Sequence, residues 1–92
     1  MSRTAPSLAR IDAFLTALRA GVPGDQADHV LGEAEALRRA VAAFHMEAIR
    51  FRMHAVDRAL KANPNARLQQ LFDELRHELE AAGFHTRSHT AP

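Results

Sequence analysis

Apolar residues recur every three or four positions along most of this chain, which is the period of an amphipathic α-helix. No stretch alternates between apolar and polar residues as a half-buried strand does, and β-branched residues are few. The pattern therefore predicts an all-α protein. Ser7 is a suitable N-cap for its first helix. The helices are expected over residues 7–20, 26–62 and 64–82.

These helices are predicted to form a single domain, residues 7–83, between flexible tails at 1–6 and 84–92. Asn63 followed by Pro64 ends the second helix, and Asn63 caps the third. Because this link is so short, the second and third helices are expected to fold back on each other as a long antiparallel hairpin beside the short N-terminal helix.

The long predicted helix over residues 26–62 carries two apolar stripes, whereas a hairpin needs only one. With about 100° of rotation per residue, the first stripe contains Leu37, Val41, Phe44, Ala48, Phe51 and Ala55. The second stripe contains Ala42, Met46, Ile49, Met53, Val56 and Leu60. The third helix can cover only one stripe, so the other is predicted to pack against the first helix or against a second copy of the chain.

The small size of the chain favours a second copy. A domain of fewer than about 80 residues rarely buries enough apolar surface to offset its conformational entropy comfortably. The 92 residues include no Cys, so no disulfide can compensate. We therefore expect a homodimer in which two hairpins form a four-helix-bundle core, and the alternative is a monomeric three-helix bundle. The predicted dimer interface consists of Met46, Ile49, Met53, Val56 and Leu60.

Three basic residues at seven-residue spacing lie between the two stripes: Arg38, His45 and Arg52. Cations in such a half-buried place require partners. One interpretation is an anion-binding pocket at the dimer interface, in which the arginines clamp a phosphate or carboxylate and His45 responds to pH. The other interpretation is pairing with acidic side chains of the same or a second chain, such as Glu33, Glu35 or Glu78.

No catalytic, metal or cofactor site is expected from the sequence. Glu74 and His77 have the Glu-x-x-His spacing of di-iron bundles, but they project away from the leucine stripe of their helix. The chain has no glycine-rich phosphate loop and no nucleophile on a Gly-flanked turn. These observations predict that the protein is not an enzyme.

The charge of the chain also limits its partners. Twelve basic and eleven acidic residues give a net charge of +1, and the basic residues of the middle segment are spread around the helix, so nucleic acid is not an expected partner. Arginine outnumbers lysine eleven to one, which together with abundant alanine indicates a GC-rich bacterial genome. The sequence has no signal peptide and no apolar run of the ~18 residues that a membrane span needs, so a cytoplasmic location is expected.

Together these features predict a small regulatory or adaptor protein that acts through protein–protein interaction, with itself and with another protein. The surplus of apolar surface on a chain without a catalytic constellation is the basis of this prediction. The alternative is a ligand- or metal-sensing regulator that could bind DNA.

Overall fold

The computed structural model describes residues 4–21, 25–62 and 64–84, and these residues contain four helices and no strand. The prediction of an all-α protein is therefore confirmed. The helices are α1 (Ala5–Gly21), α2 (Asp25–Ala42), α3 (Met46–Ala62) and α4 (Ala66–Ala81).

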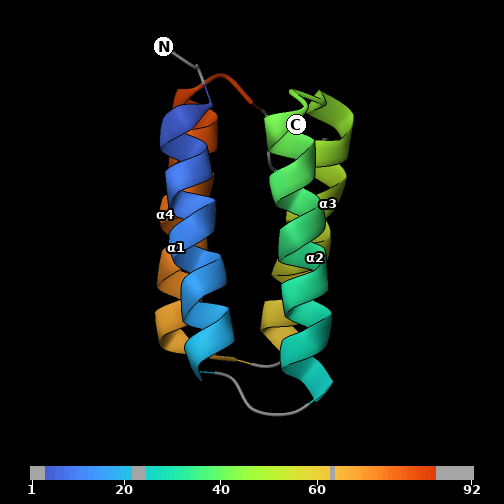
Figure 1. Cartoon of the computed structure of the whole chain (residues 1–92), viewed down its shortest axis with the longest axis vertical. Helices are drawn as coiled ribbons and strands as arrows, with labels where there is room; N and C mark the ends of the chain where they lie inside the picture. The colour runs from blue at the N-terminus through green and yellow to red at the C-terminus, as the bar shows by residue number, and fades with distance from the viewer. Residues whose placement is uncertain (1–3, 22–24, 63, 85–92) are drawn as a thin grey trace.

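The four helices stand side by side, and each runs antiparallel to the next one along the chain (Figure 1). In this view α1 and α2 lie in front, with α4 behind α1 and α3 behind α2. α2 packs against both α1 and α3, and α1 packs against α4, whereas α3 and α4 have the smallest contact. The start of α1, the end of α4 and the turn between α2 and α3 therefore gather at one end of the molecule.

The first and last helices each bury one apolar face. α1 and α4 meet at Phe14 and Phe72, whose ring centroids lie 5.9 Å apart. Both rings are fully buried, so this contact fixes α1 against α4 deep in the core. The other core residues of the two helices are Ile11, Leu15, Leu18, Leu68, Leu71, Leu75 and Leu79.

The middle of the chain requires a correction, because the continuous helix predicted over residues 26–62 is two helices. α2 ends at Ala42 and α3 begins at Met46, and the two helices pack against each other in antiparallel directions. Two short helices that fold back cover each other's apolar faces within one chain. A single helix of that length would have left one of its faces for a different partner.

The break has the hydrogen-bond pattern of a Schellman motif. The Phe44 amide donates to the Val41 carbonyl, and the His45 amide donates to the Ala40 carbonyl, both at 3.0 Å. Phe44 has a φ of 59°, in the left-handed region that normally holds glycine. A residue with a Cβ atom loses roughly 1–2 kcal/mol in this conformation. The core packing of α2 and α3 has to offset that loss.

The two stripes seen in the sequence are one buried stripe that changes phase at this turn. α2 buries Val30, Ala34, Leu37 and Val41, and the same spacing continued into α3 would bring Ala48, Arg52 and Ala55 to the core. Those three residues are partly exposed instead. α3 buries the positions one residue later, a rotation of about 100°. The buried residues of α3 are Ile49, Met53, Val56, Ala59 and Leu60.

The start of α1 also differs from the prediction. Ser7 was expected to cap the helix, but the helix begins at Ala5 and Ser7 lies inside it with no exposed surface. The Leu8 amide donates to the Thr4 carbonyl at 2.8 Å, which extends the helical hydrogen bonding to the start of the described chain. Thr4 is buried as well, so residues 4–6 belong to the domain and not to a tail. Residues 1–3 lie outside the described residues.

The N-cap of α4 is Asn65, whose Oδ1 accepts a hydrogen bond from the Leu68 amide at 3.0 Å. The backbone of Asn65 is extended, as an N-cap residue requires. The sequence predicted Asn63 for this position, which lies outside the described residues. The helix therefore starts at Ala66, two residues later than expected.

α4 ends in a second Schellman motif, this time with glycine in the left-handed position. Gly83 has a φ of 96°, and the Phe84 amide donates to the Leu79 carbonyl at 2.9 Å. The Phe84 ring is 3% exposed and lies against the Phe44 ring. Phe84 is thus part of the core, although the sequence assigned it to the C-terminal tail. The rest of that tail, residues 85–92, lies outside the described residues.

Candidate functional site

Four of the five residues predicted to form a dimer interface lie in the core of the single chain. Ile49, Met53 and Val56 have no exposed surface, and Leu60 is 2% exposed. Their side chains belong to the same hydrophobic cluster as those of the other helices. Met46, which begins α3, is the exception, with 37% of its surface exposed. The folded chain therefore presents Met46 alone of the five to a partner.

The predicted row of Arg38, His45 and Arg52 does not exist as one face of one helix. Arg38 lies on α2, Arg52 lies on α3, and His45 lies in the turn that reverses the chain between them. The seven-residue spacing aligns side chains only along a continuous helix. Each of the three residues has its own partner elsewhere in the chain.

Arg38 joins α2 to α1 through Asp12. Its Nε donates to Asp12 Oδ1 at 2.7 Å, and its Nη2 donates to Oδ2 at 3.4 Å. This two-point hydrogen bond from the Arg38 guanidinium, assisted by its charge and by that of Arg19, holds the pKa of the Asp12 carboxyl below its ordinary value of 3.8. The same contact raises the pKa of Arg38. Both side chains reach water, so the pair lies at the rim of the α1–α2 contact.

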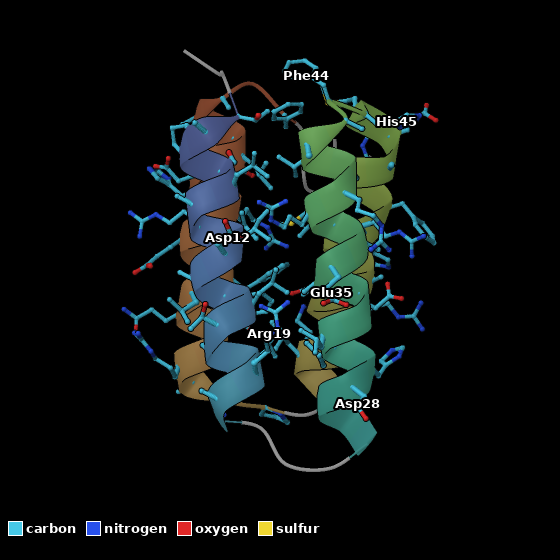
Figure 2. All side chains as sticks on the ribbon, in the orientation of Figure 1. Asp12, Arg19, Asp28, Glu35, Phe44 and His45 are labelled. Carbon is cyan, nitrogen blue, oxygen red and sulfur yellow. The ribbon has the colours of Figure 1, made fainter. Side chains whose placement is uncertain are left out.

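Arg52 joins α3 to α2 through Glu33, one of the acidic residues that the sequence suggested for it. The Arg52 Nη1 and Glu33 Oε2 atoms lie 3.5 Å apart. A further pair, Arg19 with Glu35 at 3.1 Å, crosses from α1 to α2 (Figure 2). With Asp12–Arg38, three arginine–carboxylate pairs therefore lie at two helix contacts, two of them at α1–α2 and one at α2–α3. Arg38 and Arg52 are thus both paired with a carboxylate of a neighbouring helix.

His45 acts as the N-cap of α3. Its Nδ1 accepts a hydrogen bond from the Ala48 amide at 3.2 Å, and its carbonyl accepts from the Ile49 amide at 2.9 Å. Its side chain lies at the end of the bundle, next to that of Phe44 (Figure 2). A histidine in this role satisfies a helix terminus, which explains its place without a ligand.

The Glu74 and His77 side chains lie on the surface of α4, as the helical projection indicates. Glu74 accepts hydrogen bonds from Arg10 and from Gln70, and His77 is exposed. Across residues 4–21, 25–62 and 64–84, no three His, Asp or Glu side chains lie close enough to hold a metal ion. None of the helices in these ranges is long and apolar enough to cross a membrane.

The most exposed aromatic side chain among the described residues lies on α3, at a position that the sequence assigned to a packing face. Phe51 is 62% exposed. It lines an open groove of about 460 Å³ between α2 and α3, on the side turned away from the core. Small side chains continue the apolar floor of this groove toward the end of α3: Ala55, Ala59 and Ala62.

The rim of this groove, which we call the α2–α3 groove, carries more basic than acidic side chains. His29 and Glu33 line it from α2, and Arg52 and Arg58 line it from α3. Glu33 is already paired with Arg52, which leaves the charge of Arg58 and the imidazole of His29 facing the groove. The Arg52 guanidinium lies over the Phe51 ring, 5.2 Å from the ring centroid.

The phase change at the α2–α3 turn explains why the sequence did not indicate this groove. On a continuous helix, Phe51 falls in line with Leu37, Val41 and Phe44 and is expected to pack. The turn rotates the core face of α3 by one residue, and Phe51 is left on the outside. The available signal was the offset between the two stripes, which a single rigid helix cannot bury.

Comparison with protein-family models, with curated proteins and with solved structures finds no match to this chain.

Proposed function

We propose that this chain is a non-enzymatic protein-binding module, a regulator or adaptor that receives an acidic amphipathic helix of another protein in the α2–α3 groove. The observation that carries the proposal is the exposure of Phe51 at one end of an apolar floor. A large aromatic side chain costs free energy when it stands in water, and aromatic residues dominate the energetics of protein interfaces.

The shape of the groove supports a helix as its occupant. Its floor follows α3 from Phe51 to Ala62 and is built from small side chains beyond Phe51. A helix places apolar residues at three- and four-residue spacing along one face, and such a face fits a groove between two helices. Alanines in the floor let the incoming backbone come close.

The charge of the groove supports acidic residues beside that apolar face. Arg58 and His29 line the rim, and Arg52 is shared with Glu33. α3 as a whole carries four basic side chains against two acidic ones. Complementary charge at a rim raises the association rate and discriminates between partners more than it adds affinity.

A fluorescence titration with two peptides tests the proposal. Both are amphipathic helical 20-residue peptides with the same apolar face and one Trp, and their polar faces carry either glutamate or lysine. The protein has no Trp and no Tyr, so the emission reports the peptide alone. We expect the acidic peptide to bind, and Phe51→Ser to weaken binding at least tenfold, as truncation of an aromatic hot-spot residue does.

Met46→Ser is the matched control, since Met46 is exposed but does not line the groove. It should leave the affinity unchanged. Arg58→Glu should weaken the acidic peptide and strengthen the lysine peptide. Equal binding of both peptides by the wild type, or equal effects of Phe51→Ser and Met46→Ser, would contradict the proposal.

A further inference from the structure

The turn between α2 and α3 is made of residues that favour a continued helix. Its three positions are Ala43, Phe44 and His45, with Ala42 before them and Met46 after them. None of these is Gly, Pro, Asn or Ser, the residues that usually end helices or form turns. Phe44 is nevertheless held at a φ of 59°. Local preference and tertiary structure therefore disagree at this turn.

Short connections under such conflict favour the exchange of elements between chains, because opening them relieves the conflict while the contacts between the exchanged elements can be rebuilt with a second copy. We propose that this protein forms a domain-swapped dimer in which residues 25–62 become one continuous helix. The α3–α4 half of each chain then packs on the α1–α2 half of its partner. This inference does not rest on the proposed groove function.

The contacts between the halves show what the exchange preserves. The α2–α3 and α1–α4 contacts, which hold most of the packing between the two halves, become contacts between chains. The core positions Ile49, Met53, Val56 and Leu60 then face the partner's helices, as the stripe pattern of the sequence predicts for a dimer.

The ion pairs follow the same division. The pairs Arg52–Glu33 and Arg10–Glu74 connect the two halves and become interchain pairs. The pairs Asp12–Arg38 and Arg19–Glu35 lie within the α1–α2 half and stay within one chain. Each of these four pairs keeps a partner in the exchange.

The α2–α3 turn lies at one end of the bundle, where it can open into a continuous helix. The turn lies at the same end as the start of α1 and the end of α4 (Figure 1). Two rebuilt bundles would therefore stand end to end, with the continuous helices passing through the junction. The contact between Phe44 and Phe84 is the one aromatic contact at this end, and it is made by the turn itself.

Two substitutions of Phe44 test the swap, because both remove the ring but act oppositely on the turn. Phe44→Gly suits the left-handed conformation and disfavours a continuous helix. Phe44→Ala suits a continuous helix and keeps the conflict in the turn. Light scattering after refolding from guanidinium at 1 μM to 1 mM protein should show a dimer fraction that rises at least fivefold with Phe44→Ala and falls with Phe44→Gly.

A distance measurement identifies the dimer as swapped. The chain has no Cys, so Asp28→Cys with Lys61→Cys places two spin labels on one chain. Both sites are exposed, and they lie near the same end of the closed hairpin. In a continuous helix, 33 residues separate them by about 50 Å at 1.5 Å per residue. Labelled chains refolded in an excess of unlabelled chains should give this long distance in the dimer fraction.

Three results would overturn the proposal. The first is a shift of the dimer fraction in the same direction by Phe44→Gly and Phe44→Ala, as a surface dimer through the ring predicts. The second is a dimer in which only the short intrachain distance of the closed hairpin is found. The third is a wild-type protein that stays monomeric after refolding at 1 mM. The wild-type protein is measured as well, so the proposal can still be contradicted if a Phe44 variant does not fold.

Discussion

Phe44 and Phe84 meet edge to face, with ring centroids 5.1 Å apart, where α2 and α4 both end. Phe44 is the left-handed residue of the Schellman motif that ends α2, and Phe84 follows Gly83 in the Schellman motif that ends α4. The contact between the two rings therefore joins the C-terminal ends of α2 and α4. Phe84 is buried, whereas Phe44 covers it from the turn and is half exposed. The α2–α3 turn is thus held in place from the far end of the sequence, by a residue that follows α4.

We expect Phe84→Ala to lower the free energy of unfolding by about 3 kcal/mol, because it opens a cavity where a buried aromatic ring stood. Guanidinium unfolding followed by circular dichroism measures this change. Phe51→Ala is the matched control, and it should stay within about 0.5 kcal/mol of the wild type, because Phe51 is mostly exposed. Similar losses for the two variants would show that Phe84 does not anchor the turn.

The sequence predicted the helical class and the packing faces of the first and last helices, because each face follows one unbroken period. The stripe of α4, from Leu68 to Leu79, is buried as expected. The C-terminal end of this helix was predicted at residue 82 and lies at Ala81, close to Gly83, whose positive φ favours glycine. Local signals were sufficient wherever one residue type determines the backbone.

The break at Phe44 could not be predicted from local signals, because no residue near it disfavours a helix. Its cause is the burial of α3 against the rest of the chain, which sequence propensity does not contain. The missed break also affected the predicted site. The row of Arg38, His45 and Arg52 and the dimer interface on the second stripe were both predicted for a straight helix. A one-residue offset between two stripes was the evidence for a turn.

His45→Ala should lower the free energy of unfolding by about 1 kcal/mol, because the Ala48 amide loses its capping acceptor. His45→Asp should raise stability above the alanine variant, since a carboxylate at this position accepts the same hydrogen bond and interacts favourably with the helix dipole. Urea unfolding of the three proteins at pH 7 gives the comparison. If alanine and aspartate were equivalent, the histidine would not be acting as a cap.

Met53→Ala should lower the free energy of unfolding of the monomer by about 3 kcal/mol, because Met53 is fully buried within one chain. His54→Ala, the adjacent position on the exposed side of α3, should stay within about 0.5 kcal/mol of the wild type. Thermal unfolding at micromolar concentration, with light scattering to confirm the monomer, measures both. An unchanged Met53→Ala monomer would place this residue outside the core.

Ser7→Ala should raise the free energy of unfolding by about 1 kcal/mol. Ser7 is fully buried in α1, and its Oγ has no hydrogen-bond partner among the described residues, so its desolvation is uncompensated. Alanine is also the better helix former. The reverse change Ala13→Ser, on the exposed face of α1, measures the propensity difference alone. A gain at Ser7 no larger than that difference would mean that the hydroxyl is satisfied.

The Asp12 carboxyl should titrate below its ordinary pKa of 3.8, and Arg38→Gln should move its pKa upward by removing the hydrogen bonds that lower it. Because the folded pKa is the depressed one, the Asp12–Arg38 pair stabilises the fold above pH 3.8, and this contribution is lost as the pH falls through the folded value. NMR titration of the Asp12 carboxyl carbon measures the pKa directly. Arg19→Gln is the control, and it should move the pKa less, since Arg19 acts on Asp12 only through its charge. A larger shift with Arg19→Gln than with Arg38→Gln would show that the hydrogen bonds between Arg38 and Asp12 are not what connects α1 to α2 at this point.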